Sequence, residues 1–111
     1  MLIDIDNISK DYTNKNILII GDIILDAYEF GKVDRISQEA PVPIVAIDRK
    51  SHKPGGAANV ALNLSGLGVT VDLIGIAGDD NNHDELQRCF KHNDSINLHL
   101  VKDKSRPTVV K

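Results

Sequence analysis

The sequence has 111 residues, which suffices for one small domain with its own hydrophobic core. Aromatic residues make up 4% of it and tryptophan is absent, so Ile, Val and Leu dominate the apolar fraction, as they do in α/β proteins with buried strands. The formal net charge of −3 and the lack of any run of Lys or Arg argue against nucleic acid as a partner. Cys89 is the single cysteine and no apolar segment approaches ~20 residues, so we expect a soluble protein of the reducing cytoplasm without a membrane partner.

Strands and helices alternate from residue 16 onward, a pattern that favours a parallel sheet with crossover helices. The first strand is predicted over residues 17–20, a short apolar run that ends at Gly21 and is typical of a strand buried on both faces. The segments 28–34 and 42–47 follow. Because two prolines at the start of the second segment cannot donate ladder hydrogen bonds, we predict a small projecting hairpin outside the main sheet, over about residues 28–47.

The pair Gly55-Gly56 is predicted to turn the chain into a helix that runs to about residue 67, with Gly68 as its C-terminal cap. The remaining predicted elements are a strand over 69–77, a helix over about 82–91, a strand over 96–101 and a strand over 108–110. Asp79 and Asp80 precede the second helix, where an acidic residue usually serves as a cap.

The glycine pair is the centre of the predicted site. Glycines without Cβ let a ligand lie against the backbone, and the helix that begins there presents free N–H groups to oxygen atoms. Asn59, one turn into that helix, can both donate and accept hydrogen bonds, as a sugar diol requires. Asp26 follows the first strand, and ligands of parallel α/β sheets bind at that edge. Taken singly, each has a plain alternative: a tight turn for Gly55 and Gly56, a solvated helix residue for Asn59, and a loop acid or cap for Asp26.

Taken together, these residues resemble the first signature of the ribokinase-like carbohydrate kinases, the PfkB family. The resemblance consists of Gly55-Gly56, small Ala57, Asn59 and small Ala61, with Gly68 and Gly78 at the family's spacing. It implies an α/β fold, the N-terminal part of a ribokinase-like three-layer α/β/α domain with a projecting β-hairpin lid. Asp26 falls where the family's sugar-binding aspartate follows its first strand. Ile24 stands where ribokinases have a ligand-contacting Asn, which argues against ribose.

A closer resemblance is to the kinase domain of the bifunctional heptose enzymes that make ADP-heptose for lipopolysaccharide. It rests on the segment 35–43, with Gln38 in place of a usual proline, on Gly21-Asp22 and on Gly-Gly-Ala-Ala-Asn at 55–59. It implies phosphorylation of D-glycero-D-manno-heptose 7-phosphate at its anomeric hydroxyl, with ATP and Mg²⁺ as cofactors of the full-length enzyme.

The resemblance also divides the roles of the site residues. Asp26, Asn59, Gly55 and Gly56 would orient the sugar hydroxyls. For the 7-phosphate, Arg35 in the hairpin is the first candidate and Lys53 the second, because an arginine can hold phosphate with two parallel hydrogen bonds. The alternative for Arg35 is an ordinary exposed arginine.

In this family a later glycine-rich anion hole carries the catalytic aspartate, and the ATP pocket also lies later; neither is found by Lys111. We therefore expect no catalytic residue here, and interpret residues 1–111 as the N-terminal part of a kinase domain without its ATP-binding half. We expect the isolated polypeptide to pack loosely, a separate C-terminal polypeptide as one conceivable partner, and a homodimer through the hairpin in the intact enzyme. The competing hypothesis is a non-catalytic α/β module that binds a sugar or a protein. His83, Cys89 and His92 do not have the spacing of a metal site.

Overall fold

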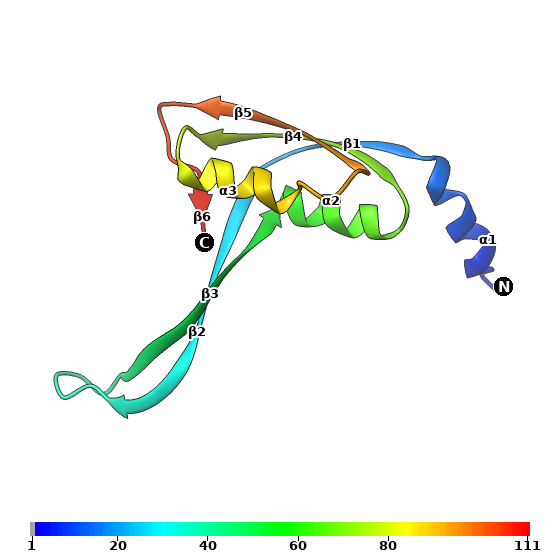
Figure 1. Cartoon of the computed structure of the whole chain (residues 1–111). Coiled ribbons are helices and arrows are strands. Elements are labelled where there is room, and N and C mark those ends of the chain that lie inside the picture. The colour runs from blue at the N-terminus through cyan, green and yellow to red at the C-terminus, as the bar shows by residue number, and fades with distance from the viewer. Residues whose placement is uncertain (1) are drawn as a thin grey trace.

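The computed structural model describes residues 2–111 and contains three α-helices, one short 3-10 helix and six strands within that range (Figure 1). The elements in chain order are α1 (Ile5–Lys10), η1 (Tyr12–Asn14), β1 (Asn16–Ile20), β2 (Ile23–Ile36), β3 (Pro43–Gly56), α2 (Ala57–Gly66), β4 (Thr70–Gly78), α3 (Asn81–Cys89), β5 (Ile96–Asp103) and β6 (Val109–Val110). Within the described residues, no helix has the length and apolar character needed to cross a membrane.

A parallel three-stranded sheet in the order β1-β4-β5 forms the body, as predicted. Alternate residues of β4 are buried because one face of the sheet lies under α2 and α3 (Figure 1). The core on this face is made by Val71, Leu73, Ala77, Ala58, Ala61, Leu86, Phe90 and Ile96, with Ile23 and Leu25 from β2. Burial of these apolar side chains is the main stabilising contribution to the fold.

The opposite face of the parallel sheet is uncovered. Leu18, Ile20, Ile76 and Val101 are 59%, 72%, 44% and 54% exposed there. The sheet and its two helices therefore form two layers in residues 2–111, and the third layer of the expected α/β/α arrangement is not formed by these residues.

A long antiparallel hairpin, β2 with β3, projects from the body (Figure 1). Each strand has 14 residues, and their pairing runs from Ile23↔Gly56 to Ile36↔Pro43. The prediction over residues 28–47 captured only the outer part, because the inner ends of both strands pack into the core and do not look like a flap in sequence. The projection also explains a radius of gyration of 18.7 Å, compared with about 13 Å for a compact chain of this length.

The last strand joins the hairpin and not the parallel sheet. β6 pairs with β2 in parallel, so the second sheet has the order β3-β2-β6. The strand predicted over residues 108–110 is confirmed as β6, and it reaches β2 because the chain turns at residues 104–107 towards the base of the hairpin.

Both predicted helix caps are confirmed. Gly68 follows α2 with φ 89°, and the Gly68 and Val69 N–H groups donate to the carbonyls of Ser65 and Leu64 at 3.0 and 3.1 Å, a Schellman motif. Asp80 is the N-cap of α3, and its carboxylate accepts a hydrogen bond from the His83 N–H at 2.9 Å.

Candidate sugar-binding site

Asp26 lies in the strand β2, so its interpretation as a loop acid or cap is wrong. It is half-buried, and its partner across the hairpin is Lys53, which places both side chains on the same face. Gly55 is the diagonal neighbour on that face. A Cβ built on Gly55 would lie 2.8 Å from Asp26 Cγ, closer than any ordinary contact. The Asp26 carboxylate therefore rests against bare main chain, and Gly55 makes this possible.

Gly56 joins the strand β3 directly to the helix α2. Its φ of 58° is favourable for glycine alone, and a Cβ at this position would collide with the main-chain oxygen of Asp22. That same oxygen accepts a hydrogen bond from the Ala57 N–H at 2.8 Å. No side chain caps α2, so its first turn offers N–H groups that have no acceptor within the helix. Asn59 lies in this first turn, as predicted, and its side chain is exposed.

The two cation candidates lie in different parts of the hairpin. Lys53 stands directly across from Asp26, and its ammonium group lies 5.3 Å from the centroid of the Tyr28 ring. Arg35 is nine residues further along β2, or about 30 Å at the rise of a strand. It lines a hollow of about 400 Å³ at the hairpin tip. The structure does not bring Arg35 to the Asp26 cluster of its own chain, because the hairpin is longer and more extended than the sequence indicated.

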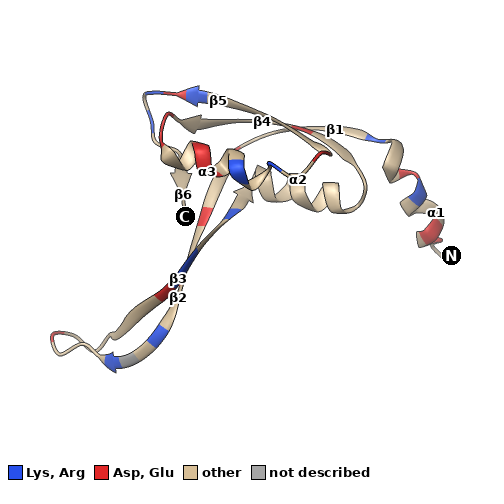
Figure 2. Cartoon of the chain, viewed as in Figure 1, with Lys and Arg blue, Asp and Glu red and all other residues tan. Residues whose placement is uncertain are grey.

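An aromatic stretch continues the Asp26 face towards the tip of the hairpin. Tyr28 and Phe30 are half-exposed and stacked, with ring centroids 6.4 Å apart, and the Arg49 guanidinium lies 4.4 Å from the centre of the Phe30 ring. Acidic and basic residues are interspersed along both hairpin strands (Figure 2). This stretch was not predicted, although the alternation of Asp26, Tyr28 and Phe30 in the sequence is a signal for one face of a strand.

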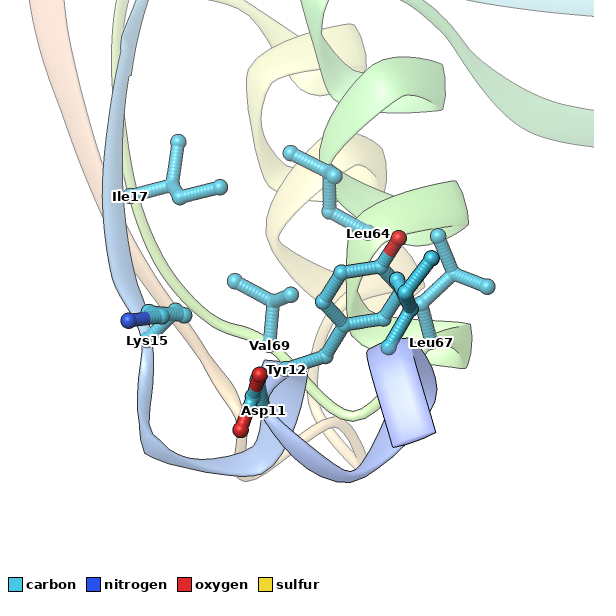
Figure 3. A pocket seen from close by; sticks show the side chains of 8 residues that line it. Asp11, Tyr12, Lys15, Ile17, Leu64, Leu67 and Val69 are labelled. Carbon is cyan, nitrogen blue, oxygen red and sulfur yellow. The ribbon is translucent and has the colours of Figure 1, made fainter. Parts of the chain in front are cut away.

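Two hollows in the body lie outside this cluster. One of about 390 Å³ opens near the carboxyl end of β1, and it is lined by Ile20, Gly21, Asp22, Ile74, Gly75, Ile76, Val101 and Arg106. The other, of about 380 Å³, lies at the amino end of the sheet, where Tyr12 reaches towards Leu64 and Leu67 (Figure 3). Its lining is mainly apolar and includes none of the predicted site residues, so it does not suit a polyhydroxylated ligand.

The titratable groups near α3 do not form a metal or nucleophile site. Within residues 2–111, no three His, Cys, Asp or Glu side chains gather closely enough to hold a metal ion. Burial raises the pKa of the half-buried Cys89 thiol, which disfavours the reactive thiolate. Hydrogen bonds from Thr108 and His83 lower the pKa of Asp80 below its ordinary value of 3.8, so the carboxylate of Asp80 serves as a structural hydrogen-bond acceptor.

Comparison with known proteins identifies the family. Residues 14–111 match the pfkB family carbohydrate kinases. The chain is 46% identical over 100 residues to the bifunctional protein HldE of Coxiella burnetii, covering 90% of this chain and 21% of that protein. It is 45% identical over 95 residues to the D-beta-D-heptose 7-phosphate kinase of Bordetella bronchiseptica, covering 86% of this chain and 30% of that kinase.

A solved structure shares the fold. The fructokinase of Xylella fastidiosa, solved with bound ATP, superimposes with a TM-score of 0.64 at 24% identity, over 86% of this chain and 28% of the fructokinase. The chain thus spans a fifth to under a third of the length of these relatives. It belongs to the pfkB family of carbohydrate kinases, with a ribokinase-like α/β fold.

Proposed function

We propose that this chain forms the sugar-binding part of an ATP-dependent kinase that phosphorylates D-glycero-D-manno-heptose 7-phosphate at its C1 hydroxyl, a step towards ADP-heptose. Two relatives support this choice of substrate: a D-beta-D-heptose 7-phosphate kinase and a bifunctional protein HldE, which are 45% and 46% identical to this chain over most of its length. The observation that carries the site is the Asp26 carboxylate resting against the bare main chain of Gly55 in a member of this family.

Each site residue has a role that its chemistry permits. The Asp26 carboxylate accepts hydrogen bonds from two hydroxyls of one sugar, and Asn59 donates to one hydroxyl while it accepts from another. Gly55 and Gly56 let the sugar ring approach the backbone. Lys53, opposite Asp26, pairs with the 7-phosphate. Phosphoryl transfer depends mainly on positioning and on electrostatic stabilisation, and these residues supply the positioning of the acceptor.

ATP is the donor that we propose, and the fructokinase of the same fold with bound ATP supports this choice. The residues described here do not gather a Mg²⁺ ligand set, so we assign no step to a metal within this chain. We place the base and the ATP pocket in the part of the kinase domain that this chain does not span. Because such a kinase uses ATP, we propose that it works in the cytoplasm.

The hairpin is the proposed lid and dimer contact of the complete enzyme. Its 14-residue strands extend about 45 Å at the usual rise, enough to reach a second subunit. Val33, Ile36, Ile44 and Ile47 expose 58%, 66%, 38% and 48% of their surface along it, and apolar surface of this kind favours association. Arg35 near the tip would then contact the partner copy and not the sugar held by its own chain.

The test is a kinase assay on the full-length product of the gene that encodes this chain. ADP release is measured with heptose 7-phosphate, ribose and fructose, for the wild type, Asp26→Asn and Asp48→Asn. Asp48 is an exposed carboxylate of the same hairpin, which makes it a matched control. We expect heptose 7-phosphate to be the preferred acceptor, and Asp26→Asn to lower kcat/KM by on the order of 100-fold. Preference for another sugar would reject the substrate, and full activity of Asp26→Asn would reject the site.

A further inference from the structure

A third strand meets Asp26 on the side opposite to Lys53. The register of β6 with β2 ends at Leu25↔Val110, but two further hydrogen bonds continue the pairing beyond it. The Lys111 N–H donates to the Leu25 carbonyl at 3.0 Å, and the Ala27 N–H donates to the Lys111 carbonyl at 2.9 Å. Bonds from one residue to both neighbours of another are the pattern of a parallel pair, so Lys111 stands directly beside Asp26.

The sheet therefore carries a row of three charged residues: Lys53 on β3, Asp26 on β2 and Lys111 directly after β6. Residues paired across adjacent strands point to the same face, and adjacent strands lie about 4.8 Å apart. Lys53 and Lys111 are exposed and Asp26 is half-buried between them. Among residues 2–111, the ion pairs involve other side chains, so both ammonium groups of the row are available to an added anion.

Lys111 is held in this row by a built network and not by a loose chain end. Thr108, which is 4% exposed, donates from its hydroxyl and its N–H to the two carboxylate oxygens of Asp80 at 2.7 and 2.8 Å. The Gly78 N–H donates to the Thr108 hydroxyl oxygen at 2.9 Å. The segment that begins at Thr108 is thus fixed to the N-cap of α3, and Lys111 follows three residues later.

We propose that Lys111 is a second phosphate-binding residue, which acts with Lys53 on the phosphate of the sugar-phosphate substrate while Asp26 between them binds hydroxyls. The inference rests on the proposed function, because it assigns the phosphate to the acceptor sugar. A phosphate monoester carries close to two negative charges at neutral pH, and two lysines neutralise it better than one. Their flexible four-carbon stems, rooted on either side of Asp26, can reach one phosphate that lies beside the hydroxyls bound by the carboxylate. The row thus selects phosphorylated over unphosphorylated sugars.

The test uses the full-length product and four proteins: wild type, Lys53→Met, Lys111→Met and Lys50→Met. Lys50 is the control, because it lies on β3 in an ion pair with Glu29, its register partner, away from the row. Methionine keeps most of the length of the side chain, removes its charge and leaves the main-chain hydrogen bonds of Lys111 in place. Calorimetry measures the Kd of heptose 7-phosphate, unphosphorylated heptose, inorganic phosphate and a non-hydrolysable ATP analogue.

We expect Lys111→Met and Lys53→Met each to raise the Kd of heptose 7-phosphate by about tenfold or more, as for other charged hydrogen bonds. The Kd of the unphosphorylated sugar and of the ATP analogue should stay within about twofold of wild type, and Lys50→Met should leave all values unchanged. Thr108→Val releases the strand and should reproduce the Lys111→Met selectivity in part, while Thr108→Ser, which keeps the hydroxyl, should not.

Other outcomes separate the proposals. Equal weakening of both sugars by Lys111→Met would give Lys111 a purely structural role, and a loss confined to the ATP analogue would assign the row to the donor; either result overturns the inference. If wild-type protein binds inorganic phosphate, Lys111→Met weakens this binding and heptose 7-phosphate does not bind, the phosphate-binding role of Lys111 is supported and the proposed substrate is rejected. Wild-type protein that binds neither phosphate compound would reject both.

Discussion

Replacing Gly55 by alanine should separate binding from folding at this site. The new Cβ would lie 2.8 Å from Asp26 Cγ and still closer to one carboxylate oxygen. The nearer carboxylate oxygen must retreat by roughly 1 Å to reach ordinary contact at 3.4 Å, and an error of about 1 Å in a positioning group can cost on the order of 100-fold. We expect Gly55→Ala to lower kcat/KM for the sugar by about 10- to 100-fold, or ~1.4 to 2.7 kcal/mol.

The same substitution should leave the fold nearly unchanged. Gly55 does not have a positive φ, so alanine fits its backbone, and removing a glycine from a strand stabilises by about 0.5 to 1 kcal/mol. The displaced Asp26 side chain costs about 0.5 to 1.5 kcal/mol if it leaves its rotamer, which offsets that gain. Thermal unfolding monitored by circular dichroism should therefore shift by less than about 3 °C. Wild-type sugar kinetics in a folded Gly55→Ala enzyme would refute the contact between this glycine and Asp26 as the basis of the site.

Three further substitutions test the fold around the site. Gly56→Ala forces a side chain into positive φ and against the Asp22 carbonyl, so it should lower stability by about 1 to 3 kcal/mol in a denaturant titration, unlike Gly55→Ala. Asp80→Asn should lower the melting temperature at neutral pH. The pKa of Asp80 is lower in the folded protein than its ordinary value of 3.8, so the ionised carboxylate stabilises the fold above pH 3.8 and this stabilisation is lost as pH falls through the folded-state pKa. Asparagine does not titrate, so the variant should lose less stability than wild type when the pH is lowered below 3.8. Leu86→Ala empties a fully buried position and should cost about 2 to 5 kcal/mol, whereas Leu67→Ala, at 56% exposure, should cost under about 1 kcal/mol; equal effects would contradict the described core.

Local signals were sufficient for the parallel sheet and its helices. The apolar runs that end in glycine predicted β1 and β4, and Asp80 and Gly68 predicted where a helix begins and another ends. These features depend on neighbours within a few residues, so the sequence carries them directly. The short helix α1, capped by Asp4, was missed because one turn and a half of helix leaves little periodic signal.

Pairings between distant segments were beyond the sequence. The sequence predicted Asp26 to lie after the first strand, but it did not show that a second strand begins almost at once. The pairing of Asp26 with Lys53 could therefore not be predicted. For the same reason the sequence did not show how far along the hairpin Arg35 lies from Asp26, and Lys111 was overlooked, since nothing local links it to Asp26. Register is set by which faces are buried and by the turn geometry of the folded chain, which single-sequence patterns do not contain.

The glycines near the site allow close packing of the backbone, whereas the charged residues near them are proposed to bind the ligand. Gly55 makes room for the Asp26 carboxylate, Gly21 lies against the first residue of α2, and Gly78 lies against Thr108, where a Cβ would sit 2.5 Å from the Thr108 nitrogen. Each marks a place where two segments come into close contact at the carboxyl edge of the parallel sheet, the edge at which ligands of such sheets bind. The signature therefore specifies how that edge is assembled, and the choice of sugar and phosphate falls to the polar side chains that the assembled edge presents. Changes of substrate within this fold should accordingly be found at the positions of the charged row and of Asn59, with the glycines retained.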